Sequence, residues 1–190
     1  FTLGHFLSMG VFLTLLILAV CFSRKLSSKQ SWWVLFAVAV TVTVFEVVKI
    51  ITRSCMGMHI DTYFPLRWCS LFLIAIWCVL SKRERVRNFG GAFIVFACGL
   101  VAVFYIFCPT SLNKYPVYHI ACLHSMFFHF VMGYSAVLIY MKKIYTPKVS
   151  HFWYYFIFTT VATIIAINKV IETTKISAIC RPGSKLWKIK

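Results

Sequence analysis

The stretch WWVLFAVAVTVTVFEVVKIIT, residues 32–52, decides the fold class. In water, its many β-branched residues would favour a β-strand. Its length, however, matches the roughly twenty apolar residues that an α-helix needs to cross the hydrocarbon core of a bilayer. In lipid a helix satisfies its own backbone hydrogen bonds, whereas an isolated strand does not. The stretch therefore predicts a membrane-spanning helix.

Further apolar runs of similar length occupy most of the remaining chain, at residues 3–22, 64–80, 90–107, 117–141 and 152–170. Hydrophobic residues make up 61% of the sequence and charged residues 13%, against about 45–50% and about 25% in soluble domains. We therefore predict an all-α, polytopic transmembrane bundle of about six spans. A single membrane domain, residues 1–170, would be followed by a basic tail, residues 171–190. The first run lacks a preceding basic region and a clear cleavage site, so we expect a retained span.

The net charge of +16 comes from 20 Lys and Arg residues against four acids. In a soluble protein this balance would indicate nucleic-acid binding, but here the bases lie mostly in short connections, so we expect no nucleic-acid partner. The connections after the first, third and fifth spans hold ten bases: Arg24, Lys25, Lys29, Lys82, Arg83, Arg85, Arg87, Lys142, Lys143 and Lys148. The other two connections hold three: Arg53, Arg67 and Lys114.

The positive-inside rule therefore predicts that the ten-base connections are cytoplasmic and that the N-terminus lies outside. The basic tail would then also lie outside. Either another helix follows it or the tail is atypical, and the sequence leaves both open.

Eight cysteines are scattered along the chain without a C-x-x-C pair, which argues against a zinc ribbon or a thioredoxin-type motif. We expect no bound metal and no other cofactor. A disulfide between Cys55 and Cys108, which both lie near predicted outer connections, stays open.

Ionisable groups inside a membrane span are costly and usually face the bundle interior. Glu46 lies in the span 32–52, either in an ion pair with Lys49 three residues later or as a site carboxylate. Cys69 lies one turn into the span 64–80, which begins at Pro65. It is either a packed core thiol or a nucleophile, whose thiolate the helix N-terminus and Arg67 would favour.

The span 117–141 carries His119, His124 and His129. At 100° per residue, one stripe of this helix contains His129, while His124 points elsewhere. The other members of that stripe are Cys122, Ser125 and Gly133. Small and polar residues are typical of the face that a membrane helix turns to its bundle.

Four polar residues from four spans map to the outer half of the membrane: His5, Glu46, Cys69 and His129. They would supply a cavity open to the outer side with a thiol, an imidazole and a carboxylate. In such a set, the cysteine attacks, the histidine takes its proton and the carboxylate orients the imidazole. We therefore take Cys69, His129 and Glu46 as candidate catalytic residues.

At these residues the chain resembles a known family. The segments FEVVKI (45–50), YFPLRWCSLFLIA (63–75) and FHFVMGYSAVLIYMKKIYTP (128–147), in this order and at these spacings, are similar to the YwaF family of membrane proteins. That family includes the animal transmembrane protein 164. The resemblance covers about residues 1–150. The matched positions are His5 in the opening FTLGHFL, Glu46, the motif residues Pro65, Leu66 and Cys69, Pro109 at the end of GLVAVFYIFCPT, and His129.

The animal member of this family is an acyltransferase that moves fatty acyl chains onto ether-linked lysophospholipid through an acyl-cysteine. The resemblance thus implies membrane lipids as partners, Cys69 as nucleophile and His129 as base. Candidate substrate-binding residues are His5, Lys49, Arg67 and Ser125. One segment departs from the family: family members carry an Asn near the last helix, and VIETTKISAIC (170–180) has Thr and Lys there.

Two other functions stay open on the residues alone. In a metal-dependent hydrolase, His5, Glu46, Cys69 and His129 would be ligands, since zinc accepts nitrogen, sulfur and oxygen. In a carrier or small-molecule-binding protein, Glu46, Lys49 and His129 would line a path. A purely structural bundle is the fallback, and the sequence does not give the oligomeric state.

Overall fold

The computed structural model describes residues 3–55, 68–107, 118 and 120–179. Within them the chain is helical and contains no strand, so the predicted fold class is confirmed. The elements, in chain order, are α1 (Leu3–Ser23), α2 (Ser28–Cys55), α3 (Trp68–Val79), α4 (Glu84–Phe93), the π-helical turn η2 (Ile94–Cys98), α5 (Gly99–Phe107), α6 (Ile120–Met141), the 3₁₀ turn η3 (Val149–His151) and α7 (Phe152–Ile179).

Four helical segments in this part of the chain are long and apolar enough to cross a membrane: Phe6–Ser23, Ser28–Thr52, Glu84–Phe107 and Cys122–Met141. The third consists of α4, η2 and α5 joined end to end. The described part of α3 has 12 residues, and the apolar segment Val149–Ile165, formed by η3 and the first part of α7, is also shorter. The protein is therefore an integral membrane protein, and a total of six crossings stays a prediction.

Helix α7 continues to Ile179, past residue 170, near which we expected the last span to end. The sequence becomes polar before the helix ends, with Asn168, Lys169 and Glu172, and a helix accommodates such residues. Helix ends and span ends are set by different properties of the chain. The division into a membrane domain and a tail stays a prediction.

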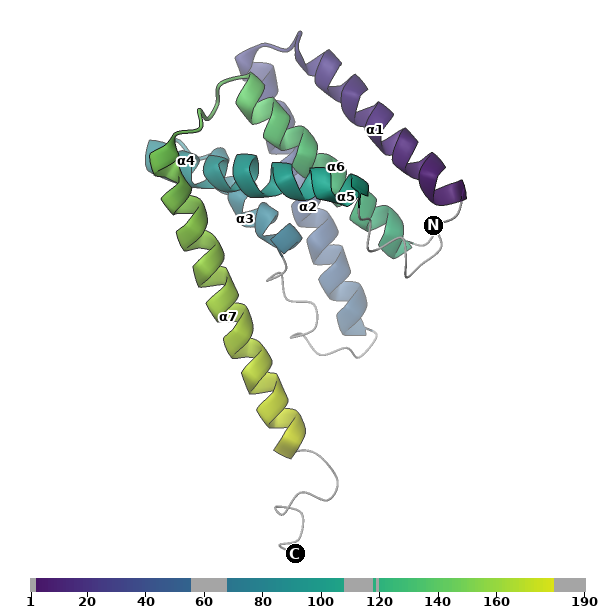
Figure 1. The fold of residues 1–190 in the computed structure, drawn as a ribbon, viewed down its shortest axis with the longest axis vertical. Coiled ribbons are helices and arrows are strands. Elements are labelled where there is room, and N and C mark those ends of the chain that lie inside the picture. Colours follow the sequence, from purple (N-terminus) through teal and green to yellow (C-terminus); the bar gives the residue numbers. More distant parts are fainter. Residues whose placement is uncertain (1–2, 56–67, 108–117, 119, 180–190) are drawn as a thin grey trace, which may run out of the picture.

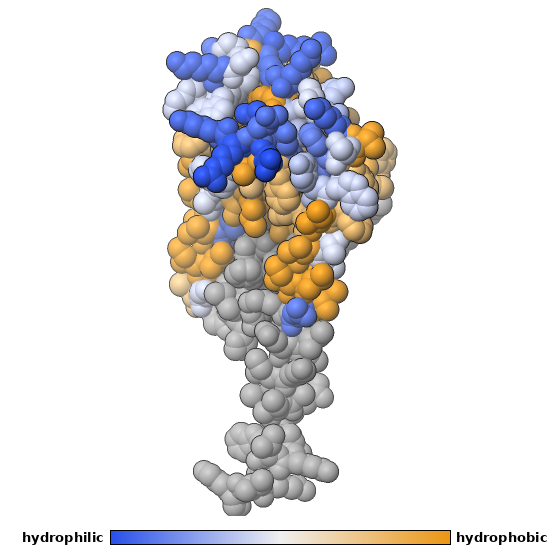
Figure 2. Space-filling view, turned by 90° about the vertical axis from the view of Figure 1, so that its left-hand side faces the viewer, coloured by the Kyte–Doolittle hydropathy of each residue, from blue (hydrophilic) through white to orange (hydrophobic). Residues whose placement is uncertain are grey.

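The segment α4–α5 runs across the other helices (Figure 1), and the three basic connections gather toward one end of the molecule. We call this the basic end; it comprises the α1–α2, α3–α4 and α6–α7 connections. The Lys142 ammonium of the last connection donates hydrogen bonds to the carbonyls of Arg24 and Leu26 in the first, at 3.1 and 2.5 Å. Figure 2 shows the hydrophilic surface at this end and apolar surface below it. That apolar surface requires lipid rather than water around it.

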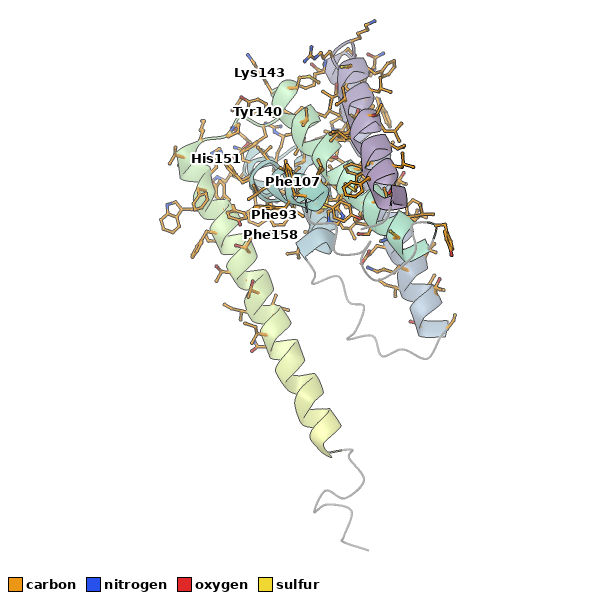
Figure 3. The ribbon with its side chains drawn as sticks, turned by 45° about the vertical axis from the view of Figure 1, so that its right-hand side comes forward. Phe93, Phe107, Tyr140, Lys143, His151 and Phe158 are labelled. Atoms are coloured by element: carbon orange, nitrogen blue, oxygen red, sulfur yellow. The ribbon has the colours of Figure 1, made fainter. Side chains whose placement is uncertain are left out.

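Helix α6 lies at the centre and contacts α1, α2, α3 and α5, whereas α7 packs mainly on α4. The rings of Phe93 and Phe158 join α4 to α7 with centroids 4.5 Å apart (Figure 3). Most of the described side chains of α7 are exposed.

Small residues set the antiparallel register between α5 and α6. A Cβ added at Gly133 would lie 3.0 Å from Ala102 Cβ, and one added at Gly99 would lie 3.4 Å from Ala136 Cβ. Such pairs let two helix backbones approach closely where no large side chain intervenes. Three or four residues further along, the same register brings Tyr105 opposite His129.

Candidate functional site

His129 lies in the middle of α6 and is only 8% exposed. Its Nδ1 atom lies 2.7 Å from the carbonyl oxygen of Ser125, one turn earlier. Because a carbonyl oxygen can only accept, Nδ1 carries the ring proton in this bond. A neutral imidazole in this tautomer keeps its lone pair on Nε2, which is the form that a general base requires.

The ring of Tyr105 on α5 fixes the plane of this imidazole. The two ring centroids are 3.9 Å apart and the planes differ by 11°, a stacked pair. Tyr105 is itself buried, and the ring of Phe12 on α1 lies near it, tilted, with centroids 6.3 Å apart. The imidazole therefore has a fixed tautomer and a fixed orientation before any substrate binds.

Tyr105 was not among the predicted site residues. It is one of nine tyrosines and lies in an apolar helix with no distinguishing local pattern. The signal that could have identified it is the pairing of Gly99 and Ala102 with Ala136 and Gly133, extended by one helical turn.

Glu46 on α2 is 2% exposed and forms an ion pair with Lys49. The sequence had left two roles open for Glu46, and this ion pair is one of them. The pair uses carboxylate oxygen Oε1. The second oxygen, Oε2, is buried without a hydrogen-bond partner among the described residues. A buried carboxylate with an open lone pair retains capacity for a further donor, so the ion pair leaves the predicted site role untested.

The segment of α2 that holds Glu46 packs on the same part of α6 that precedes His129. Phe45 contacts His124 and Phe127, with ring centroids 6.2 and 5.1 Å apart. His124 also packs on Phe128, at 4.7 Å. His124 therefore faces the α2 side among aromatic rings, while His129 faces α5, in agreement with the predicted stripe.

The remaining predicted site residues are described only in part. Cys69 is the second residue of α3, and His5 lies in the first turn of α1, but both side chains fall outside the described atoms. Arg67 lies outside the described residues. The predicted contact between Cys69 and His129 therefore stays a prediction. The ends of α2 and α5 and the starts of α3 and α6 all lie away from the basic end (Figure 1).

Ser125 contributes its backbone carbonyl, and its side chain is half-buried. That carbonyl accepts the hydrogen bond from Nδ1 and so orients the imidazole. In the predicted triad, the Glu46 carboxylate was expected to have this role. Among the described residues, no three His, Cys, Asp or Glu side chains are grouped as a metal site would require. The metal-dependent hypothesis thus receives no support from this part of the chain.

The comparisons with known proteins give one family. A family model, that of the TMEM164 family, matches residues 1–175. No curated protein and no solved structure matches the chain.

Proposed function

Since the chain belongs to the TMEM164 family, we propose that it transfers a fatty acyl chain between phospholipids through a thioester on Cys69. The resemblance described above motivates the reaction class. The observation that carries the proposal is the state of His129: a buried imidazole with its proton held on Nδ1 and its plane held by Tyr105.

The reaction has two half-steps. In the first, Nε2 of His129 takes the thiol proton of Cys69, and the thiolate attacks the ester carbonyl of a donor phospholipid. The bond between the acyl carbon and the glycerol oxygen breaks, and the leaving alkoxide takes the proton from the imidazolium. The products are a lysophospholipid and an acyl-cysteine.

In the second half-step, the hydroxyl of an acceptor lysophospholipid gives its proton to His129 and attacks the thioester carbonyl. The carbon–sulfur bond breaks, and the thiolate recovers the proton from the imidazolium. No net oxidation or reduction occurs, so the proposal needs no cofactor. Water in place of the acceptor would give hydrolysis, which burial of His129 among α1, α5 and α6 disfavours.

Within this proposal, Glu46 and Lys49 bind the polar part of the lipid. The Lys49 ammonium is half-buried and attracts a phosphate, while Glu46 Oε2 is available to a donor on the headgroup. An intramembrane ion pair placed near a substrate path is a common functional arrangement. His5, Arg67 and Ser125 remain candidates for further substrate contacts.

The test uses the purified full chain in detergent with a phospholipid whose acyl chain carries an alkyne. We expect hydroxylamine-sensitive labelling of one cysteine, mapped by mass spectrometry to Cys69 and absent in Cys69→Ala. His129→Gln should lower the labelling rate by about 10²–10⁴-fold, the range for loss of a general base.

His124→Gln is the matched control, because His124 lies on the same helix five residues earlier and contacts α2 rather than Tyr105. It should label at close to the unmodified rate. Labelling that persists in Cys69→Ala, or that falls equally in the two histidine variants, would refute the proposal.

A carrier is the second candidate, favoured by the unsatisfied Oε2 of Glu46 inside an apolar helix. Lipid or solute movement in proteoliposomes that needs Glu46 and survives Cys69→Ala would support it over the enzyme.

A further inference from the structure

A groove lies between α2 and α3, and its wall begins one helical turn after Cys69. Its volume is about 540 Å³, and its walls come from Thr43 of α2 and from Leu73, Ile74, Trp77 and Cys78 of α3. None of the candidate site residues lines it. The groove is shallow and largely open to its surroundings.

The Trp77 indole and the Thr43 hydroxyl in the wall are already hydrogen-bonded. The indole N–H of Trp77 donates to Thr43 Oγ1 at 3.0 Å, and Thr43 Oγ1 donates to the Ala39 carbonyl at 2.7 Å. The remaining wall is mostly aliphatic or aromatic, and its residues Ile74 and Trp77 are exposed. The groove therefore offers apolar surface without demanding hydrogen bonds, which suits a hydrocarbon chain.

The two remaining wall residues, Ser81 and Val86, flank the turn between α3 and α4. The exposed residues between them include Lys82, Arg83 and Arg85, with Glu84 as the one acid in this turn. The groove therefore ends directly at a basic surface.

The start of α4 adds to this positive charge. Arg83 is its N-cap residue and makes no side-chain capping hydrogen bond to the first-turn amides. Uncapped amides and the helix dipole both favour an anion at this position. Three features thus coincide at one place: an apolar groove, a basic turn and an uncapped helix N-terminus.

We propose that this groove binds one anionic phospholipid from the leaflet at the basic end. One acyl chain lies along Leu73, Ile74 and Trp77, and the negatively charged headgroup contacts Lys82, Arg83 and the first turn of α4. Basic pockets between membrane helices recognise anionic headgroups in this way. The residues of this site differ from those of the proposed acyl-transfer site, and lipid binding here does not depend on the acyl-transfer chemistry.

The experiment uses the full chain, unmodified, in phosphatidylcholine vesicles with a small fraction of a photoreactive lipid. The lipid carries a diazirine in one acyl chain and has either a phosphatidylglycerol or a phosphatidylcholine headgroup. We expect the anionic probe to label α3 at least about fivefold more than the zwitterionic probe, the preference expected for one or two cations near the headgroup. The adducts should map by mass spectrometry to Leu73, Ile74 or Trp77.

Two double variants separate this site from a general attraction to the basic end. Lys82→Gln with Arg83→Gln should lower anionic labelling of α3 to the zwitterionic level. Arg24→Gln with Lys25→Gln removes the same charge from the α1–α2 connection, whose residues do not line the groove, and should preserve the preference. Equal labelling by both probes, or equal loss in both double variants, would overturn the proposal.

Discussion

A buried hydroxyl pair joins the end of α1 to α6. Ser23 Oγ and the Tyr134 hydroxyl are 2.6 Å apart, and Ser23 Oγ also lies 2.7 Å from the Ala19 carbonyl. The carbonyl can only accept, so the single hydroxyl hydrogen of Ser23 goes to Ala19. The Tyr134 hydroxyl must therefore donate to Ser23, and the direction of the whole chain of bonds is set.

This direction predicts unequal effects of the two deletions. Tyr134→Phe removes a donor and leaves Ser23 bonded to Ala19, at a cost of about 0.5–1.5 kcal/mol. Ser23→Ala leaves the buried phenol without its acceptor, at a cost of about 1–3 kcal/mol. Thermal unfolding in detergent should rank Ser23→Ala as the less stable variant.

The double variant is the control for that ranking. With both hydroxyls removed, no unsatisfied group remains, so its stability should approach that of Tyr134→Phe. Strict additivity of the two costs would contradict the assigned direction of donation.

At the scale of elements, α3 and α4 approach so closely that their contact depends on a missing side chain. A Cβ at Gly90 would lie 2.4 Å from the Ala75 carbonyl oxygen and 2.6 Å from Cys78 Cβ. Neither backbone nor Cβ can move aside as a flexible side-chain end could. The adjacent Gly91 leaves room for the buried ring of Tyr145, 2.6 Å from its added Cβ.

Gly90→Ala should therefore separate α3 from α4 and destabilise the protein by about 1–3 kcal/mol, the usual cost of overpacking. Gly10→Ala on α1 is the matched control, because a Cβ there would meet nothing within 4 Å. Its thermal stability in detergent should equal or exceed that of the unmodified chain, since alanine favours helix. A Gly90→Ala variant as stable as Gly10→Ala would show that the helices are not in this contact.

The sequence predicted the helices because a chain in lipid must satisfy its own backbone hydrogen bonds, which leaves few structures other than a helix. Each apolar run in the described residues forms a helix. The π-helical turn Ile94–Cys98 was not predicted. One extra residue in a helical turn changes no composition or periodicity that a single sequence displays. The turn packs against α6, a tertiary contact that the sequence alone does not show.

The site was predictable where geometry is local. The Glu46–Lys49 pair follows from a spacing of three residues, and the separate faces of His124 and His129 follow from helical periodicity. The stacking of Tyr105 on His129 depends on the register between α5 and α6. Register in a membrane bundle comes from small-residue contacts between helices, which a single chain shows only as scattered Gly and Ala.

At the scale of the whole molecule, charge and apolar surface are sorted along one direction. The ten bases of the three connections lie at the basic end, and exposed apolar side chains cover the helices below it (Figure 2). Lys142 in the α6–α7 connection donates hydrogen bonds to backbone carbonyls of the α1–α2 connection, so these two connections are held together. This sorting is what a fixed orientation in the membrane requires.

The basic end should therefore face the cytoplasm. The chain contains no N-x-Ser/Thr sequence, so an inserted glycosylation acceptor reports its own side without background. An acceptor with a flexible spacer placed within residues 108–117 should gain a glycan in microsomes. The same cassette placed between Thr146 and Pro147, in the α6–α7 connection, should not. The reverse pattern would show that the protein has the opposite orientation in the membrane. The proposed anionic-lipid groove would then lie in the lumenal or outer leaflet, where anionic lipids are scarce.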